Sequence, residues 1–391
     1  MRGANPFIMS PACDITQRWF IAALWLACTT LFASTLAAQS QATWRLRPLT
    51  RIEGVETAGG YTFNRVNSIL VTRNGSVVVA DVGNVEIRVF SADGKFLNRI
   101  GAEGRGPGEY ERIGSLGLLG DTVWVIDSRL RRTTLFRISG EFQQVIQSDR
   151  SRPGTALPNA LVAKGRVLGV GYSTDHGREP HLPLLLMNRS GRVLDTLAWL
   201  PNLHPAVVTL ARSGGGYTIG PQPFSDAGLT FVSPEATRIF VVDRSAATAA
   251  ENASFRITAF EPDGVTVWDR TFRYTPTRFE RSRADSLLKA TERLLGGNGN
   301  AETDIRRAVF IPQYYVPITG GFVSGDGSLW LRREEHGASV EYRVIAANGR
   351  GLATLTVPAT TTLLAGTSSE IWGVERDEYD VQTVVRYAIL K

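Results

Sequence analysis

The sequence predicts an all-β protein, a six-bladed β-propeller of four-stranded blades that is closed by its N-terminal strand and carries a short helical insert. Three observations predict it. A unit of two hairpins recurs along the chain, and the units follow one another at a nearly constant spacing. The last unit lacks its fourth strand, and the N-terminal region contains an additional strand that belongs to no other unit. Four-stranded units about 40–50 residues apart are typical of propeller blades.

The second strand of each unit is its most regular feature. It is short, rich in β-branched and aromatic residues, as a buried strand should be, and it ends in a polar or charged residue. The six segments are 77–81, 123–127, 167–172, 239–243, 329–333 and 371–375.

The spacing of these strands shows where extra chain lies. Asp81 to Asp127 is 46 residues, Asp127 to Tyr172 is 45, and Arg333 to Glu375 is 42. The intervals from Tyr172 to Asp243 (71) and from Asp243 to Arg333 (90) are longer, which indicates inserts between these units.

Turn residues divide each unit into hairpins. Pairs such as Asn74-Gly75 and Asp326-Gly327 separate the first strand from the second, and Asp93-Gly94 or Asn348-Gly349 separate the third from the fourth. Such pairs favour tight hairpin turns, so each unit has four strands.

Closure of the ring is predicted at the two ends of the chain. After Glu375 a single strand, 381–390, completes the sequence, so the last unit has three strands. A spare strand near 45–53 would pair with it and remove the open edge. Pro48 would then need an edge or bulge position.

One insert, 277–309, is predicted to be helical. Thr277 and Glu280 have capping-box spacing, apolar residues follow at helical intervals, and Gly296-Gly297 ends the helix. A second short helix is expected over 300–308. The insert is either a packing decoration on the ring or a lid over one face.

Residues 1–38 have the composition of a signal peptide. Arg2 and Arg18 precede an apolar run, 19–38, that ends in small residues. The run is also long enough to be an uncleaved anchor, and Cys28 leaves lipoprotein anchoring as a further alternative. We expect cleavage, a periplasmic or secreted location, no membrane span after cleavage, and a mature propeller over 44–391.

Cysteine and charge exclude several functions. Both cysteines, Cys13 and Cys28, lie in the N-terminal segment, so a cleaved chain has no disulfide, thiolate nucleophile or cysteine metal site. The net charge of +6 falls to +5 after cleavage, a mild excess spread along the chain. Together with export, this argues against nucleic acid as a partner.

The first unit, with Val77–Asp81, Asn84, 87–90 and Asp93-Gly94, resembles the NHL-type repeat. The run from Gly101 to Tyr110 is similar to a glycine-rich segment of exported bacterial six-bladed propeller proteins, as are Ile311-Pro312 and 327–330. The resemblance covers most of 44–390 and implies the fold. It implies little about activity, because that wider group includes ligand binders, scaffolds and a few lyases.

No motif in the chain indicates a cofactor. The glycines of 101–110 lack the following helix that would hold a phosphate, so the run is interpreted as a link between blades. The four histidines are His176, His181, His204 and His336, and none has the spacing of a zinc hydrolase motif. We therefore expect no catalytic residue, no metal ligand and no cofactor.

The candidate binding site is a polar ring at the ends of the second strands, which should share one face. Cations and carboxylates are nearly balanced there, which suits a hydroxyl-rich or zwitterionic ligand. The alternative is that these residues cap turns and pair with one another. The ring residues are Asp81, Asp127, Arg129, Tyr172, Asp243, Arg244, Arg332, Arg333, Glu375 and Arg376.

Two classes of function remain open. The first is a non-catalytic exported propeller, expected to be a monomer, that binds a protein, peptide or glycan on one face. The second is a propeller lyase or lactonase with a metal in the central channel, which would need several His, Asp or Glu side chains to converge on the axis.

Overall fold

The computed structural model describes a single folded unit, Ala42–Lys391. The residues described are 42–53, 61–147, 157–171, 180–211, 215–296, 302–334 and 337–391. The predicted signal peptide, 1–38, lies outside them.

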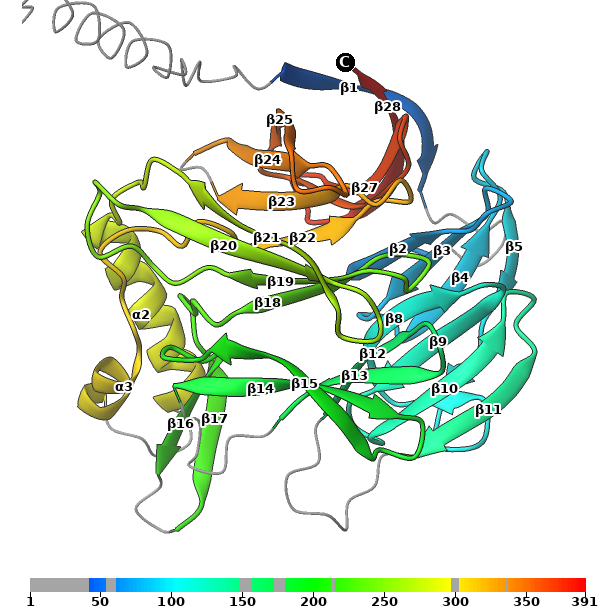
Figure 1. The fold of residues 1–391 in the computed structure, drawn as a ribbon, viewed down its shortest axis with the longest axis horizontal. Helices are drawn as coiled ribbons and strands as arrows, with labels where there is room; N and C mark the ends of the chain where they lie inside the picture. Colours follow the sequence, from blue (N-terminus) through cyan, green and yellow to red (C-terminus); the bar gives the residue numbers. More distant parts are fainter. Residues whose placement is uncertain are drawn as a thin grey trace, which may run out of the picture. The chain divides into compact units, whose positions relative to one another are not determined.

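Six blades of four antiparallel strands form a propeller (Figure 1). Blades 1 to 4 are separate sheets, and blades 5 and 6 share one eight-stranded sheet. Blade 1 is β2 (Val66–Val71), β3 (Val77–Asp81), β4 (Glu86–Phe90) and β5 (Phe96–Arg99). Blade 2 is β8 (Ile113–Leu119), β9 (Thr122–Asp127), β10 (Arg132–Arg137) and β11 (Phe142–Gln147). Blade 3 is β12 (Leu157–Val162), β13 (Arg166–Val170), β14 (His181–Asn188) and β15 (Val193–Pro201).

Blades 4 to 6 follow the same order. Blade 4 is β18 (Leu229–Val232), β19 (Ile239–Asp243), β20 (Ser254–Phe260) and β21 (Thr266–Arg273). Blade 5 is β22 (Gly320–Val323), β23 (Leu329–Glu334), β24 (Ser339–Ile345) and β25 (Gly351–Pro358). Blade 6 is β26 (Thr361–Gly366), β27 (Glu370–Arg376), β28 (Gln382–Leu390) and β1 (Ala42–Ile52). The predicted fold class is confirmed, and each predicted second strand is found within a residue or two.

The N-terminal strand closes the ring as predicted. β1 runs antiparallel to β28, from Arg45 opposite Leu390 to Ile52 opposite Val384. The register shifts between Pro48 and Thr50, because proline has no N–H to give to the ladder. The first three residues of β1 also pair in parallel with β25, so the strand joins blades 5 and 6 at their outer edges.

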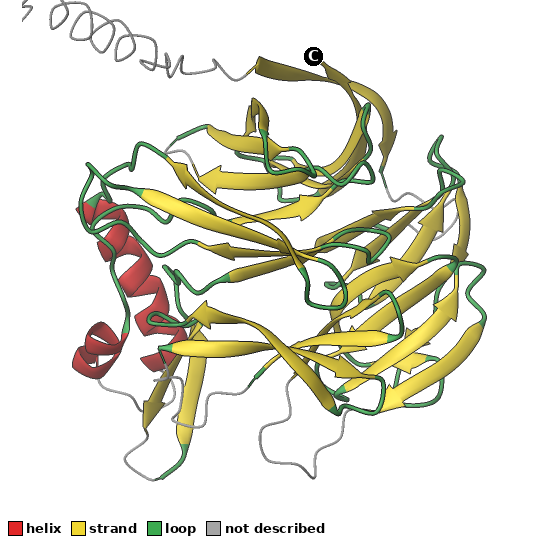
Figure 2. Ribbon diagram, viewed as in Figure 1, coloured by secondary structure: helices red, strands yellow, loops and turns green. Residues whose placement is uncertain are grey.

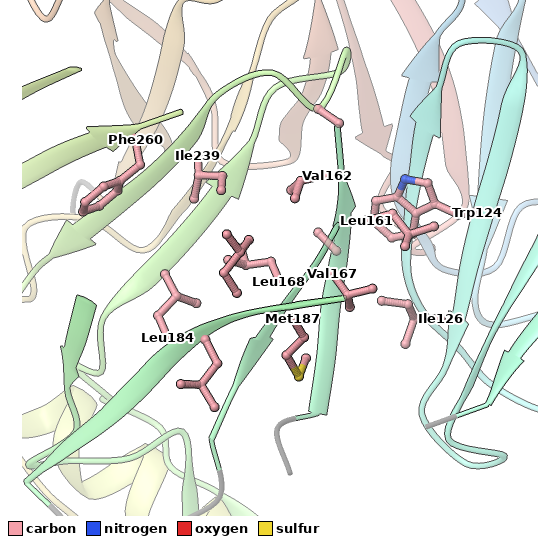
Figure 3. Packing of buried hydrophobic residues seen from close by; sticks show 14 of the residues in the cluster. Trp124, Ile126, Leu161, Val162, Val167, Leu168, Leu184, Met187, Ile239 and Phe260 are labelled. Carbon is pink, nitrogen blue, oxygen red and sulfur yellow. The ribbon is translucent and has the colours of Figure 1, made fainter. Parts of the chain in front are cut away.

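The hydrophobic core lies between adjacent blades. Figure 3 shows one such cluster, in which Trp124 and Ile126 of blade 2 lie near Leu161 and Leu168 of blade 3. The same cluster reaches Ile239 and Phe260 of blade 4. Packing of this kind makes every blade depend on its neighbours, and this explains why an open ring would be costly.

The link from blade 1 to blade 2 is the glycine-rich run. Its two short strands, β6 (Ala102–Glu103) and β7 (Glu109–Tyr110), pair in parallel. The Arg132 guanidinium donates to the carbonyls of Arg105, Gly106 and Glu109. The run is therefore a tethered connection between blades, as predicted.

The inserts pack against each other at the side of blade 4. The hairpin β16 (Val207–Ala211) and β17 (Tyr217–Pro221) lies against α2 (Arg281–Gly296) and α3 (Glu302–Ala308), drawn in red in Figure 2. Val208 and Leu210 pack with Leu288, Leu295 and Ile305. These contacts bury the apolar side of α2 on the hairpin.

The start of the helix differs from the sequence prediction. Thr277 is not its N-cap, because α2 begins at Arg281. The Thr277 carbonyl accepts from the Tyr315 N–H, and the Phe279 N–H donates to the Gln313 carbonyl. Pairing with this distant segment holds 277–279 extended and outweighs the local capping pattern.

Candidate functional site

The carboxylate of Asp81, which ends β3, is only 1% exposed and is surrounded by donors. Its two oxygens accept six hydrogen bonds of 2.8–3.2 Å. The donors are the N–H groups of Asn64, Arg65, Gly83 and Asn84, the Tyr61 hydroxyl and the Asn84 side-chain amide. Asp81 thus ties the loop that enters blade 1 to the turn between β3 and β4.

Asp127 occupies the equivalent position in blade 2 and has the same kind of environment. It is 1% exposed. Oδ2 accepts from the Glu111 N–H at 2.6 Å, and Oδ1 accepts from the N–H groups of Arg129 and Leu130 at 2.8 and 2.9 Å. Two of the predicted ring carboxylates therefore fasten entry loops and turns through backbone donors.

In blade 4 the buried cation is Arg244. It donates to the carbonyls of Ala227 and Ile318 at 2.7 and 3.0 Å. Burial lowers the pKa of Arg244 to about 10, and the nearby Asp226 carboxylate opposes this shift. Asp243 accepts from the N–H and hydroxyl of Ser245, so it caps its own turn.

The remaining ring residues form separate contacts. Arg333 bonds Glu341 at 2.8 Å and the Thr275 carbonyl at 3.3 Å. Glu375 accepts from Tyr387 and pairs with Arg51, which lies on the closing strand.

The more exposed cations of the ring have looser partners. Arg129 reaches Glu111 at 3.3 Å, and Arg376 reaches Asp380 at 3.8 Å. The Nε atom of Arg332 is buried without a hydrogen-bond partner among the described residues. Tyr172 lies outside the described residues. Ligand binding by the ring stays a prediction, and the described contacts are those of turns, entry loops and neighbouring strands.

A second candidate site lies on the axis of the ring. A cavity of about 680 Å³ is lined by the first strands of all six blades: β2, β8, β12, β18, β22 and β26. Neither α2 nor α3 contributes to its lining, and neither do the nine ring residues that the structure describes. Pockets of about 300–1,000 Å³ are the usual size for small-molecule ligands.

The cavity wall combines apolar side chains with small polar ones. Asn159 donates its side-chain amide to the Thr230 hydroxyl at 2.8 Å, a bond that links blades 3 and 4. The uncharged polar residues that line the cavity are Asn67, Ser68, Thr72, Ser115, Asn159, Thr230, Ser233, Thr367 and Ser368. Hydroxyl and amide groups of this kind can orient a polar ligand without a large desolvation cost.

A glycine lets a tryptophan pack closely against one inner strand. Trp124, on β9, lines the cavity, and its indole lies over Gly117 of β8. A Cβ at position 117 would be 2.1 Å from Trp124 Cζ2. The Trp124 Nε1 is buried and has no hydrogen-bond partner in the part of the chain that the structure describes. Only glycine allows the indole to lie so close to the inner strand.

An ion pair spans one end of the cavity. We call this end the mouth; it is formed by the turns that join the first and second strands. Arg73 of blade 1 donates through Nη2 and Nε to Glu235 Oε1 of blade 4, at 2.9 and 3.1 Å. Blades 1 and 4 are three positions apart in the ring of six, so the pair crosses the axis. The predicted ring lies at the opposite face, because each second strand runs away from the mouth.

The sequence of the inner strands contains a signal for the axial cavity that the prediction of a charged ring did not use. Ser68 and Ser115 stand at equivalent places, each two residues after the start of an inner strand. A polar residue recurring within an otherwise apolar strand is a signal for a lined channel. The Arg73–Glu235 pair carried no such signal, because 162 residues separate its members.

Possible metal donors are scattered. Across the described ranges, no group of three or more His, Cys, Asp or Glu side chains is placed to hold a metal ion. His204 bonds Asp226 through Nδ1 at 3.0 Å and stacks on Phe310, away from the cavity lining. His176 and His336 are outside the described residues. None of the helices in the described part of the chain is long and apolar enough to cross a membrane.

Comparisons with known proteins agree with the fold. A family model described as "6-bladed beta-propeller" matches residues 54–152. The crystal structure of a member of the DUF4221 family from Bacteroides vulgatus is 11% identical, with a TM-score of 0.53, and the match covers 90% of this chain and 100% of that one. This similarity supports the propeller fold alone. No curated protein matches the sequence.

More distant structures differ in their described activities. A putative exported protein from Bacteroides fragilis is 14% identical over 89% of this chain and 96% of that one, with a TM-score of 0.47. A gluconolactonase from Xanthomonas campestris is 13% identical over 88% and 97%, with a TM-score of 0.40. The match to the family model and the six blades described above identify the chain as a six-bladed β-propeller. Its activity must be argued from its own residues.

Proposed function

We propose that this chain is an exported, non-catalytic β-propeller that binds a small ligand, or the end of a peptide or glycan, in its axial cavity. The observation that carries the proposal is the cavity of about 680 Å³, to which all six blades contribute. Propeller blades surround a central channel, and in this chain that channel keeps a cavity in the size range of small-molecule sites.

The composition of the wall supports binding rather than metal-dependent catalysis. Glu235 and Asp326 are the acidic side chains among the described lining residues, and the lining includes no histidine. Glu235 is paired with Arg73, and Asp326 accepts from the hydroxyls of Ser324 and Ser328 within its own turn. A propeller lyase or lactonase would need more donors than these.

Export is proposed on the composition of residues 1–38. N-terminal sequencing of the protein recovered from outside the cytoplasm should find a start between Ala38 and Thr43. An intact Met1 would contradict cleavage, and lipid on Cys28 would indicate a membrane-anchored lipoprotein.

The binding proposal is tested with a panel of amino acids, dipeptides and oligosaccharides, scored by thermal stabilisation of the full-length protein. Thr230→Phe places a large side chain on the cavity wall and should abolish the shift given by any ligand. Thr271→Phe, at an exposed position of the outermost strand of blade 4, is the matched control and should leave the shift unchanged. Binding that survives Thr230→Phe would refute the axial site, and a stoichiometric bound metal would favour the enzyme class.

A further inference from the structure

The mouth carries three charged side chains, those of Arg73, Glu235 and Asp326. The Asp326 carboxylate accepts hydrogen bonds from Ser324 and Ser328 within its own turn, whereas Arg73 and Glu235 are in direct contact with each other. The other polar groups of the lining are hydroxyls and amides. Recognition of a charged group on a ligand would therefore take place at the Arg73–Glu235 pair. The inference rests on the axial binding function proposed above.

Two properties allow a ligand to replace the bond between Arg73 and Glu235. The side chains of Arg73 and Glu235 are 75% and 54% exposed, and ion pairs this exposed contribute little to stability. Each comes from a turn, Arg73 next to Asn74-Gly75 and Glu235 after Pro234. A ligand that offers a partner to each charge can therefore replace the bond at low cost.

The short distance between Arg73 and Glu235 determines which ligand charges the mouth accepts. Because Glu235 Oε1 lies 2.9 Å from Arg73 Nη2, an anion that contacts Arg73 also meets the Glu235 carboxylate. A cation that contacts Glu235 meets the guanidinium in the same way. Like charges this close repel even near the surface, so a ligand with a single charge is disfavoured at either member.

Just inside the mouth the wall is apolar. Val71 precedes Arg73 by two residues, Val232 precedes Glu235 by three, and Leu118 lies two residues before the turn residue Gly120. All of them line the cavity. A ligand whose charged end sits at the mouth would place its next few atoms against these side chains.

We propose that the axial site takes a compact zwitterion with an apolar side chain, the chemistry of an apolar α-amino acid. The carboxylate binds Arg73, the ammonium group binds Glu235, and the side chain enters the cavity between Val71, Leu118 and Val232. Each charge keeps a partner when water leaves, and the apolar group is buried.

The test compares three probes of nearly equal shape by calorimetry on the full-length protein at fixed ionic strength. L-leucine carries both charges, 4-methylpentanoate lacks the ammonium group, and 3-methylbutylamine lacks the carboxylate. We expect leucine to bind at least about tenfold more tightly than either, given the repulsion between like charges in contact. Equal affinities for the three, or tighter binding of phosphoethanolamine, would overturn the inference.

Variants assign the recognition to the pair. Arg73→Glu places two carboxylates at the mouth and should weaken leucine binding by about tenfold or more. The double exchange Arg73→Glu with Glu235→Arg restores one charge of each sign and should recover most of the affinity. Arg256→Glu, which breaks an exposed pair with Asp269 on outer strands, is the matched control and should have no effect.

The outcomes separate this inference from the proposed function. If a ligand from the panel loses binding in Thr230→Phe but binds unchanged when Arg73 and Glu235 are substituted, the zwitterion proposal is wrong and the axial site is retained. Leucine binding that survives both Thr230→Phe and Arg73→Glu would overturn both.

Discussion

Replacing Asp81 by asparagine tests whether the carboxylates at the ends of the second strands are structural. Six donors converge on the two oxygens of Asp81, three on each. Asparagine keeps one acceptor oxygen and presents an NH₂ group where three donors point. The substitution is nearly isosteric, so its effect reports on the hydrogen bonds rather than on packing.

The expected magnitude follows from the bonds lost. Hydrogen bonds to a charged group contribute about 1.5–3 kcal/mol each. Taking the lower value, because the loop can relax, three lost bonds correspond to about 4.5 kcal/mol in the free energy of unfolding. That is large for one substitution, and it is in the range seen when a buried hydrogen-bond network is broken.

Urea unfolding at pH 7, followed by tryptophan fluorescence, measures this loss. Asp121→Asn is the control, because Asp121 lies exposed in the turn between β8 and β9 and should change stability by less than about 0.5 kcal/mol. If Asp81→Asn stays within about 1 kcal/mol of the parent, the structural reading of the bonds is wrong. If Asp81→Asn keeps this stability and also loses ligand binding, the polar ring at the ends of the second strands is the binding site.

Three further substitutions test closure, an inter-blade contact and acid stability. Ile52→Ala, in the closing strand and 4% exposed, should lower the free energy of unfolding by about 2–5 kcal/mol in urea; an unchanged midpoint would argue against closure by β1. Arg333→Gln should lower the melting temperature by several degrees while Arg129→Gln leaves it unchanged, since the Arg333 side chain is 19% exposed and bonds Glu341 and the carbonyl of Thr275, in the segment that follows blade 4, whereas that of Arg129 is 68% exposed; equal melting temperatures would contradict this. Burial disfavours the Asp326 carboxylate, but hydrogen bonds from Ser328 and Ser324 outweigh it and lower its pKa. Its contribution to stability is therefore present above the unfolded-state value of 3.8 and is lost as the pH falls further; Asp326→Asn should flatten that part of a pH–stability curve, and an unaltered curve would refute it.

The blades could be predicted from sequence because their signals are local. A short apolar strand, a turn pair such as Asn74-Gly75 and a second strand ending at Asp81 lie within a few residues of one another. Closure was also accessible, since it follows from counting strands at the two ends of the chain. The start of α2 was not, because the partner that holds 277–279 extended is the segment 313–315.

The role of the strand-ending carboxylates was harder to predict, because their partners are backbone groups. Asp81 is bonded by the N–H groups of Asn64 and Arg65, which belong to the loop before the blade. Any residue can supply a backbone N–H, so such a partner leaves no pattern of residue types. A buried carboxylate that fastens a turn and one that faces a ligand therefore look alike in sequence.

The hollow axis is a consequence of side-chain size. Between blades 5 and 6 the space is filled by bulky residues, with Trp330 1% and Tyr342 0% exposed. The lining of the cavity includes the small side chains of Ser68 and Ser115, and Gly120, where a Cβ would meet nothing within 4 Å. A phenylalanine at Thr230 would extend into the cavity and would lose the bond from Asn159, so it should block the cavity at a cost of about 1 kcal/mol. If the axial site binds the ligand, Thr230→Phe should fold normally and no longer bind. If position 230 instead lies in a close-packed core, the added phenylalanine should destabilise the ring.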